Sequence, residues 1–184
     1  MQLKLVFCVL FVSLLTSVFD LNSLQDAVVF KFTNAVCESY NKSWIVFHNY
    51  RLKAVGRDKV LLNLNATLLH PAQGVTIRGR ILKRANGYKP WLFDMTFDAC
   101  RFMRQQNIPV VSLIYGLFKQ FTNINHTCPY VGPAIIKDWY LNPELLRLPL
   151  PTGEYMLALR WFFEKQLVSD TNISFVFVED LLKS

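Results

Sequence analysis

Residues 91–98, with the sequence WLFDMTFD, alternate bulky apolar side chains with polar ones. An extended chain points successive side chains to opposite faces, so the apolar members of this stretch share one face. These are Trp91, Phe93, Met95 and Phe97, and the opposite face carries Asp94, Thr96 and Asp98. Such a period of two is typical of a half-buried β-strand.

The same alternation recurs along the chain and predicts about seven strands in all. Further strands are expected at residues 30–34, 44–55, 62–68, 75–81, 155–163 and 173–178. Turn signals separate several of these strands, at Gly56-Arg57-Asp58, His70-Pro71, Asn86-Gly87 and Pro151-Thr152-Gly153. This succession of alternating strands predicts a mainly β, antiparallel β-sandwich.

One segment departs from the period of two. Large apolar residues recur in it at helical spacing, namely Ile108, Val111, Tyr115, Phe118 and Phe121. Asn107 is a candidate N-cap, and Pro109 falls in the first turn, where its missing N–H is not needed. We therefore expect residues 98–123 to be largely helical. This segment is one excursion from a single sandwich domain, which we assign to residues 18–184.

The N-terminus has the pattern of a signal peptide, which we assign to residues 1–17. Lys4 supplies the positive start and residues 5–15 form an apolar run of suitable length. A stable membrane anchor would need roughly 20 apolar residues, and Asp20 and Asn22 end this run too early. The expected localisation is secreted and extracellular.

The formal net charge of +7 reflects a basic chain. Its Lys and Arg residues are scattered rather than clustered, and the secretory route argues against nucleic acid as a partner. A solvated surface is the simpler interpretation, with anionic lipid headgroups, sulfated glycans or acidic proteins as alternatives.

Removal of the signal peptide takes Cys8 with it and leaves three cysteines. An odd count in an exported chain implies one pair plus a free or intermolecular thiol. Cys100 and Cys128 flank the helical segment and are the expected pair, which leaves Cys37 as the free thiol. We expect Cys37 to act as a small buried residue rather than as a reactive one. Metal binding by cysteine is not expected, because the chain has no CxxC motif.

Four N-glycosylation sequons fit the same compartment. They begin at Asn41, Asn65, Asn125 and Asn172.

Catalysis has little support in the sequence. The three histidines, His48, His70 and His126, show no metal-ligand spacing and have no obvious nucleophilic partner. Asp94 and Asp98 share a strand face, but residues i and i+4 on a strand lie roughly 13 Å apart, too far for paired carboxylates. We therefore expect no enzyme activity, no cofactor and no metal.

Aromatic residues are abundant, with 15 Phe, 7 Tyr and 4 Trp. Bulky residues at the rims of a sandwich can hold its sheets apart and leave an apolar cleft between them. The candidate lining residues are Phe93, Phe97, Leu159, Trp161, Phe175 and Phe177. A fully packed core is an equal alternative on these residues alone.

Several blocks resemble a large insect family of uncharacterised secreted proteins. The blocks are residues 30–34, 52–55, 87–93, 98–102, 123–130 and 148–155. That family includes the CheB-type chemosensory proteins and is similar to the ML lipid-recognition superfamily. The resemblance implies an immunoglobulin-like, ML-type sandwich, a Cys100–Cys128 disulfide and non-catalytic binding of lipids or hydrocarbon cues. Many members carry a second cysteine that pairs with the position of Cys37, where this chain has Tyr50.

We therefore expect a secreted binding protein for an apolar small molecule, such as a lipid or a hydrocarbon-like cue, with a chemosensory role implied by the resemblance. The alternative is an extracellular protein–protein interaction module with a filled core that docks on a receptor.

Overall fold

The computed structural model describes residues 28–146 and 150–179, so the signal peptide expected at residues 1–17 lies outside the described part. The described residues contain eight strands, two α-helices and two short 3-10 helices. In chain order they are β1 (Val29–Ser39), β2 (Ile45–Ala54), β3 (Val60–Ala72), β4 (Val75–Ala85), β5 (Gly87–Asp98), α2 (Ala99–Gln105), α3 (Pro109–Phe118), η2 (Lys119–Phe121), β6 (Tyr130–Trp139), η3 (Pro143–Leu145), β7 (Gly153–Phe163) and β8 (Gln166–Val178).

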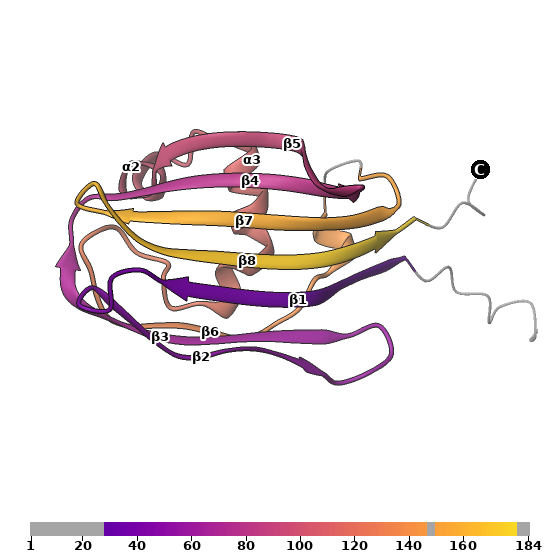
Figure 1. The fold of residues 1–184 in the computed structure, drawn as a ribbon, viewed down its shortest axis with the longest axis horizontal. Helices are drawn as coiled ribbons and strands as arrows, with labels where there is room; N and C mark the ends of the chain where they lie inside the picture. Colours follow the sequence, from indigo (N-terminus) through magenta and orange to yellow (C-terminus); the bar gives the residue numbers. More distant parts are fainter. Residues whose placement is uncertain (1–27, 147–149, 180–184) are drawn as a thin grey trace, which may run out of the picture. The chain divides into compact units, whose positions relative to one another are not determined.

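The strands form two antiparallel sheets (Figure 1). The larger sheet has the order β1-β8-β7-β4-β5, and the smaller one has the order β2-β3-β6. The predicted mainly β, antiparallel sandwich is therefore confirmed, and the arrangement is consistent with an immunoglobulin-like sandwich. The helical excursion falls between β5 and β6, as expected.

The longest ladder joins β7 to β8 and shows how alternation builds the interior. Leu157 lies opposite Ile173, and Tyr155 lies opposite Phe175. All four side chains are buried, because the odd-numbered residues of this part of both strands point inward. The expected strand at 173–178 is thus the second half of β8, which begins at Gln166.

The turn between β7 and β8 carried no recognised turn signal. Glu164 and Lys165 both adopt positive φ, at 48° and 68°, the backbone of a two-residue hairpin turn. The Glu164 carboxylate also accepts hydrogen bonds from the backbone N–H groups of Gln73 and Gly74, at 2.9 and 2.8 Å. A contact 90 residues away thus compensates for the absence of Asn or Gly in the turn.

Two strand assignments differ from the sequence prediction. Strand β6 was not expected, because Gly132 and Pro133 interrupt its alternation. The turn expected at His70-Pro71 is wrong, because β3 continues to Ala72. The β3–β6 register shifts between Leu68 and Ala72, so Pro71 lies where the ladder is already interrupted.

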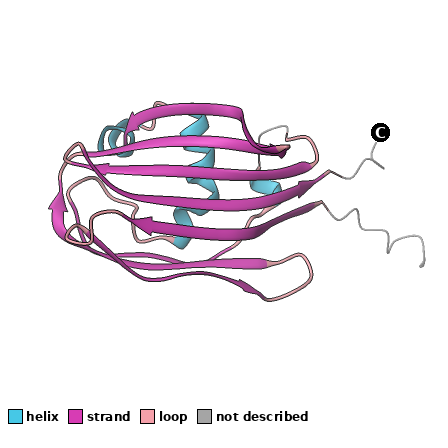
Figure 2. Cartoon of the chain, viewed as in Figure 1, coloured by secondary structure: helices cyan, strands magenta, loops and turns pink. Residues whose placement is uncertain are grey.

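The helical segment consists of two helices rather than one continuous helix. Gln106, at φ 45°, ends α2 in the left-handed region. Ile108 rather than Asn107 precedes α3, so the predicted Asn107 cap is wrong, while Pro109 does begin the first turn. Figure 2 shows the longer helix passing behind the strands of the five-stranded sheet.

A disulfide between Cys100 and Cys128 closes the excursion, with Cα atoms 5.4 Å apart. It ties the first turn of α2 to the chain just before β6. Because α3 lies within the closed loop, the disulfide restrains the helix against the sandwich.

The interior has a densely packed end, which we define by Phe30, Tyr155, Phe175 and Phe177. The Phe30 ring meets Phe175 and Phe177 edge to face, with centroids 5.7 and 5.8 Å apart. The Tyr155 ring stacks on Phe175 at 5.5 Å. These rings pack directly against one another. From Leu157 and Ile173 onward, the interior of the sandwich instead contains a cavity.

Candidate ligand-binding cavity

A cavity of about 220 Å³ lies between the two sheets, with α3 as one wall. The inner face of the three-stranded sheet supplies Phe47, Tyr50, Leu64, Ala66, Ala134 and Trp139. The inner face of the five-stranded sheet supplies Ile77, Gly79, Phe97, Leu159, Trp161 and Thr171. Helix α3 contributes Val111, Ile114, Tyr115 and Phe118. The lining is therefore almost wholly apolar, and we call this part of the interior the cavity end.

Small residues on the inner faces of the two sheets leave room for the cavity, and the larger side chains around them enclose it. Ala66 and Ala134 lie opposite each other across β3 and β6, and both are buried against the cavity. On the other sheet, a Cβ added at Gly79 would meet the Phe93 ring at 3.2 Å. Glycine at this position therefore lets the Phe93 ring lie closely against strand β4.

The cavity meets the surface beside edge strand β6. Four lining residues are exposed to solvent there, namely Asn123, His126, Val131 and Pro133. The Asn123 side chain also bonds to β6, donating to the Pro133 carbonyl at 2.7 Å and accepting from the Ile135 N–H at 2.7 Å. We place the mouth at this connection, since an exposed lining residue marks a contact between the cavity and solvent.

Several polar groups of the lining have partners within the protein. Trp161 Nε1 donates to Thr171 Oγ1 at 2.9 Å, and the Tyr130 hydroxyl donates to the His126 carbonyl at 2.6 Å. The Thr122 hydroxyl donates to the Ile135 carbonyl at 2.9 Å. Burial, with a smaller effect of Tyr115, raises the pKa of Tyr130 to about 12, so its hydroxyl remains a neutral donor.

Two buried polar atoms of the lining find no hydrogen-bond partner among the described residues. They are the Tyr50 hydroxyl and Trp139 Nε1. Burial, and to a lesser degree the nearby Cys37 thiol, raise the pKa of Tyr50 far above its ordinary value. The Tyr50 hydroxyl therefore stays protonated and able to donate.

Four of the six residues predicted to line a cleft do so: Phe93, Phe97, Leu159 and Trp161. Phe175 and Phe177 do not line the cavity. They share the inner face of β8 with Ile173, but they lie at the packed end, where the rings of Phe30 and Tyr155, on the strands either side of β8, pack against them.

The lining residues that α3 and the three-stranded sheet supply were not predicted from the sequence. The helical spacing of Val111, Tyr115 and Phe118 predicted an apolar helix face, but nothing local indicated which layer that face would cover. Trp139 carried no signal at all, because β6 was not expected to be a strand.

The candidate catalytic groups have structural partners. The Arg78 guanidinium donates to both Asp94 oxygens, at 2.9 and 2.8 Å, and holds the pKa of that carboxyl below its ordinary value. Asp98 caps α2 by accepting from the Arg101 N–H at 2.9 Å. His48 Nε2 lies 2.9 Å from Thr67 Oγ1. Within residues 28–146 and 150–179, no group of three or more His, Cys, Asp or Glu side chains is placed to hold a metal ion.

Cys37 is a half-buried free thiol among the described residues. It lies on β1 opposite Thr171 of β8, and burial raises the pKa of its thiol. A raised pKa keeps the thiol protonated, which makes it a poor nucleophile.

The four sequon asparagines differ in exposure. Asn65 and Asn125 are exposed, whereas Asn41 and Asn172 are half-buried. The Asn41 side chain also accepts hydrogen bonds from Ser43, from its N–H at 3.1 Å and its hydroxyl at 2.6 Å. These hydrogen bonds engage Oδ1 and leave the Asn41 side-chain nitrogen, the atom to which a glycan is attached, unbonded by Ser43.

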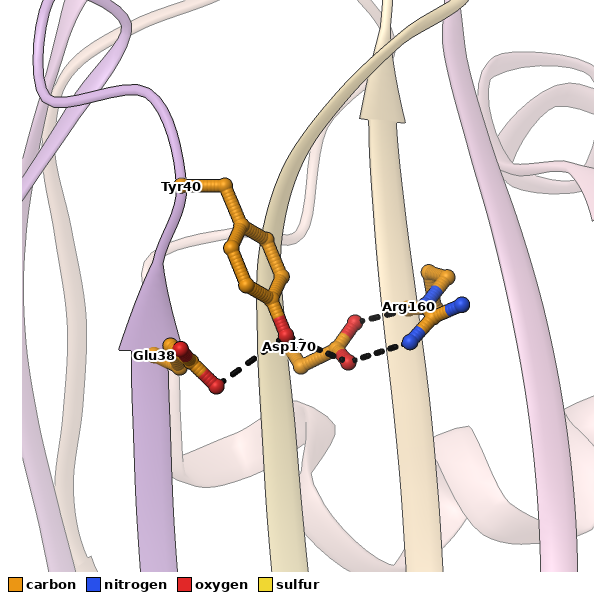
Figure 3. Close-up of polar contacts among 4 residues, drawn as sticks. All are labelled: Glu38, Tyr40, Arg160 and Asp170. Carbon is orange, nitrogen blue, oxygen red and sulfur yellow. Dashed lines mark hydrogen bonds and ion pairs between the residues drawn. The ribbon is translucent and has the colours of Figure 1, made fainter.

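The outer face of the five-stranded sheet carries a polar cluster, drawn in Figure 3. Arg160 donates to both oxygens of Asp170, at 3.0 and 2.8 Å. The Tyr40 hydroxyl lies within hydrogen-bond distance of Asp170 and Glu38, at 3.1 and 3.0 Å. Because Arg160 stabilises the carboxylate, the pKa of Asp170 is lowered. This face is polar and paired, in contrast to the apolar interior behind it.

Residues 77–157 match a family described as "Protein of unknown function (DUF1091)". The matched part runs from β4 into β7 and includes both cysteines of the disulfide and helices α2 and α3. No curated protein matches the chain. Among the described residues, no helix has the length and apolar character needed to cross a membrane.

Proposed function

We propose that this protein is a secreted, non-catalytic carrier that holds an apolar small molecule in the cavity between its sheets. The observation that carries the proposal is the cavity itself, which both sheets and α3 line almost wholly with apolar side chains. Transfer of apolar surface from water into such a site is favourable without any catalytic group.

The size of the cavity favours a small or slender ligand. Its volume of about 220 Å³ exceeds the ~150 Å³ of an apolar cavity that holds benzene. It falls below the ~300–1,000 Å³ that is usual for sites of drug-sized ligands. A single lipid tail or a hydrocarbon-like cue fits these bounds better than a bulky ring system.

Export is part of the proposal. The apolar run at residues 5–15, the four sequons and the Cys100–Cys128 disulfide all suit an oxidising, extracellular setting. The sequence blocks that resemble the CheB-type chemosensory proteins and the ML lipid-recognition superfamily support a role in presenting a chemical cue, with an extracellular receptor as the protein partner.

An extracellular docking module is the second candidate function. The observation in its favour is a group of exposed apolar side chains on edge strand β5, namely Tyr88, Trp91 and Leu92. Exposed apolar groups of this kind can mark a protein contact. The docking module was expected to have a filled core, however, and the cavity between the sheets argues against that expectation.

Native mass spectrometry of the protein secreted from insect cells, followed by solvent extraction, tests the carrier proposal. We expect a stoichiometric apolar adduct on the wild-type protein. The Ala66→Leu variant should lose the adduct, because the added carbons occupy the cavity beside β3. Ala54→Leu, at an exposed position near the end of β2, is the matched control and should retain it.

Should Ala66→Leu fail to fold, Ala134→Leu on the neighbouring strand serves the same purpose. An empty wild-type protein that also takes up no fatty acid, sterol or long hydrocarbon would exclude the carrier function and favour the docking module.

A further inference from the structure

The two unpartnered donors of the cavity stand out from the rest of its lining. Trp139 is only 4% exposed, and the Tyr50 hydroxyl oxygen is buried, yet neither polar atom has a hydrogen-bond partner among the described residues. Trp161, Tyr130 and Thr122 line the same cavity and are all bonded to protein oxygens. Buried polar groups are nearly always paired, so two exceptions in one cavity indicate a partner that enters it.

Tyr50 and Trp139 belong to the same inner face of the three-stranded sheet. Tyr50 lies opposite Leu64 of β3 from one side, and Trp139 lies opposite Leu62 from the other side. Leu62 and Leu64 are two residues apart and point to the same face. The two donors therefore belong to the strands on either side of β3, at register positions two residues apart.

Aromatic neighbours fix both rings. Trp139 packs edge to face on Phe32 at 4.8 Å and against Phe118 of α3 at 5.4 Å. The Tyr50 ring lies 6.5 Å from that of Phe47, and Phe118 and Phe47 also line the cavity. Rings held in this way cannot easily turn their polar atoms toward bulk water.

The chemistry of the two groups defines what they can receive. An indole N–H is a donor only, and a tyrosine hydroxyl whose proton is unused presents a second donor. Among the described residues, no Asp, Glu, Lys or Arg lines the cavity, so a carboxylate bound there would lack a countercharge from these side chains. A neutral oxygen, such as that of a ketone, aldehyde, ester or alcohol, can accept from donors of this kind without this cost.

We infer that the ligand is an apolar molecule carrying a neutral oxygen acceptor, which the Tyr50 hydroxyl and Trp139 Nε1 bind within the cavity. This inference rests on the proposed carrier function and narrows its ligand class. The apolar lining binds the hydrocarbon part, and the two donors select oxygenated molecules over plain hydrocarbons.

A matched pair of volatile ligands tests the inference. Depletion of 2-decanone and of decane from the headspace above the purified protein gives their two dissociation constants. We expect 2-decanone to bind at least about tenfold more tightly than decane, because only the ketone satisfies the buried donors. Decanoic acid at pH 7 should bind more weakly than the ketone.

Three variants assign the effect to residues. Tyr50→Phe and Trp139→Phe should each weaken 2-decanone binding about tenfold and leave decane binding nearly unchanged. Tyr50→Phe should also leave the empty protein as stable as the wild type or more so, because it removes an unpaired hydroxyl. Tyr155→Phe is the control. Its hydroxyl donates to the Pro151 carbonyl outside the cavity, so its loss should lower stability and preserve the ketone-to-decane ratio.

A spectroscopic readout covers the case in which a variant misfolds. In wild-type protein labelled with ¹⁵N-tryptophan, 2-decanone should shift the Trp139 indole resonance, and decane should not. The Trp91 indole, exposed on β5 and outside the cavity lining, provides an internal reference.

The outcomes separate the two proposals. Equal affinity for ketone and decane would overturn the oxygen-acceptor inference and leave the carrier function standing. Tighter binding of the carboxylate would overturn the assignment of a neutral acceptor. Failure of all three ligands to bind would overturn the carrier function itself, and the inference with it.

Discussion

The packed end and the cavity end of the sandwich share strands β7 and β8 but differ in their interior packing. Tyr155 and Phe175 form the last pair of the packed end, and Leu157 and Ile173 form the first pair of the cavity end. All four residues follow the same alternation and are buried. The boundary between a filled interior and a hollow one therefore falls within a regular ladder, with no break in local structure.

The difference arises from the residues around the ladder. At the packed end, Phe30 of β1, the strand next to β8 in the same sheet, places its ring against two phenylalanines of β8. At the cavity end, the facing strands carry Ala66 and Ala134, whose side chains are too short to cross the gap. Helix α3 closes the side of that gap without filling it. A binding cavity thus forms where small residues face large ones across two layers.

Aromatic truncation at the two ends should give the largest contrast. Phe175→Ala should cost about 3–5 kcal/mol of unfolding free energy, because a fully packed ring leaves a new void. Phe97→Ala should cost about 1–2 kcal/mol, because its partly exposed ring already faces the cavity and lacks neighbours there. Urea unfolding of the two variants measures the difference.

Ligand binding should respond in the opposite order. Phe97→Ala should weaken the uptake of 2-decanone, whereas folded Phe175→Ala should retain it. Equal stability losses together with equal binding losses would contradict the division of the interior into two ends.

Removal of the disulfide should cause the next largest loss of unfolding free energy. Cys100→Ala with Cys128→Ala should cost about 3–4 kcal/mol, the loop-entropy value for a separation of 28 residues. Hydrogen exchange should show protection lost first in α2 and α3, which the disulfide encloses, and later in β7 and β8. Cys37→Ala provides the control, since Cys37 lies outside this loop. A uniform loss across both sheets would mean that the two ends unfold as one unit.

The polar outer face should make the smallest contribution to stability, and this contribution should be lost in acid. Because Arg160 lowers the pKa of Asp170 in the folded state, the stabilising effect is present above the unfolded pKa of about 3.9. It is lost as the pH falls below about 4 through the folded value. The partly exposed pair should be worth at most about 1 kcal/mol.

Unfolding free energies measured between pH 2 and pH 7 check this expectation. Asp170→Asn should flatten the acid limb of the profile and leave ligand uptake at pH 7 unchanged. A change in uptake would mean that the outer face and the cavity are coupled.

Local sequence patterns were sufficient for much of the fold. A period of two identified seven strands, a helical spacing identified the excursion, and the cysteine count led to the Cys100–Cys128 pair. These features depend on neighbours a few residues apart, or on compartment chemistry, and both can be read from the chain. The same patterns identified four of the six expected lining residues.

Only the tertiary structure decided which inward-facing residues surround a void. Alternation determines the face of a strand to which a side chain points, but the layer opposite that face comes from distant parts of the chain. Phe97 and Phe175 were equivalent in the sequence, yet one lines the cavity and the other fills the packed end. Likewise, Trp139 is a candidate ligand contact only because β6 pairs with β3 in the folded protein. Packing between layers is a long-range property, so it emerges only when the chain has folded.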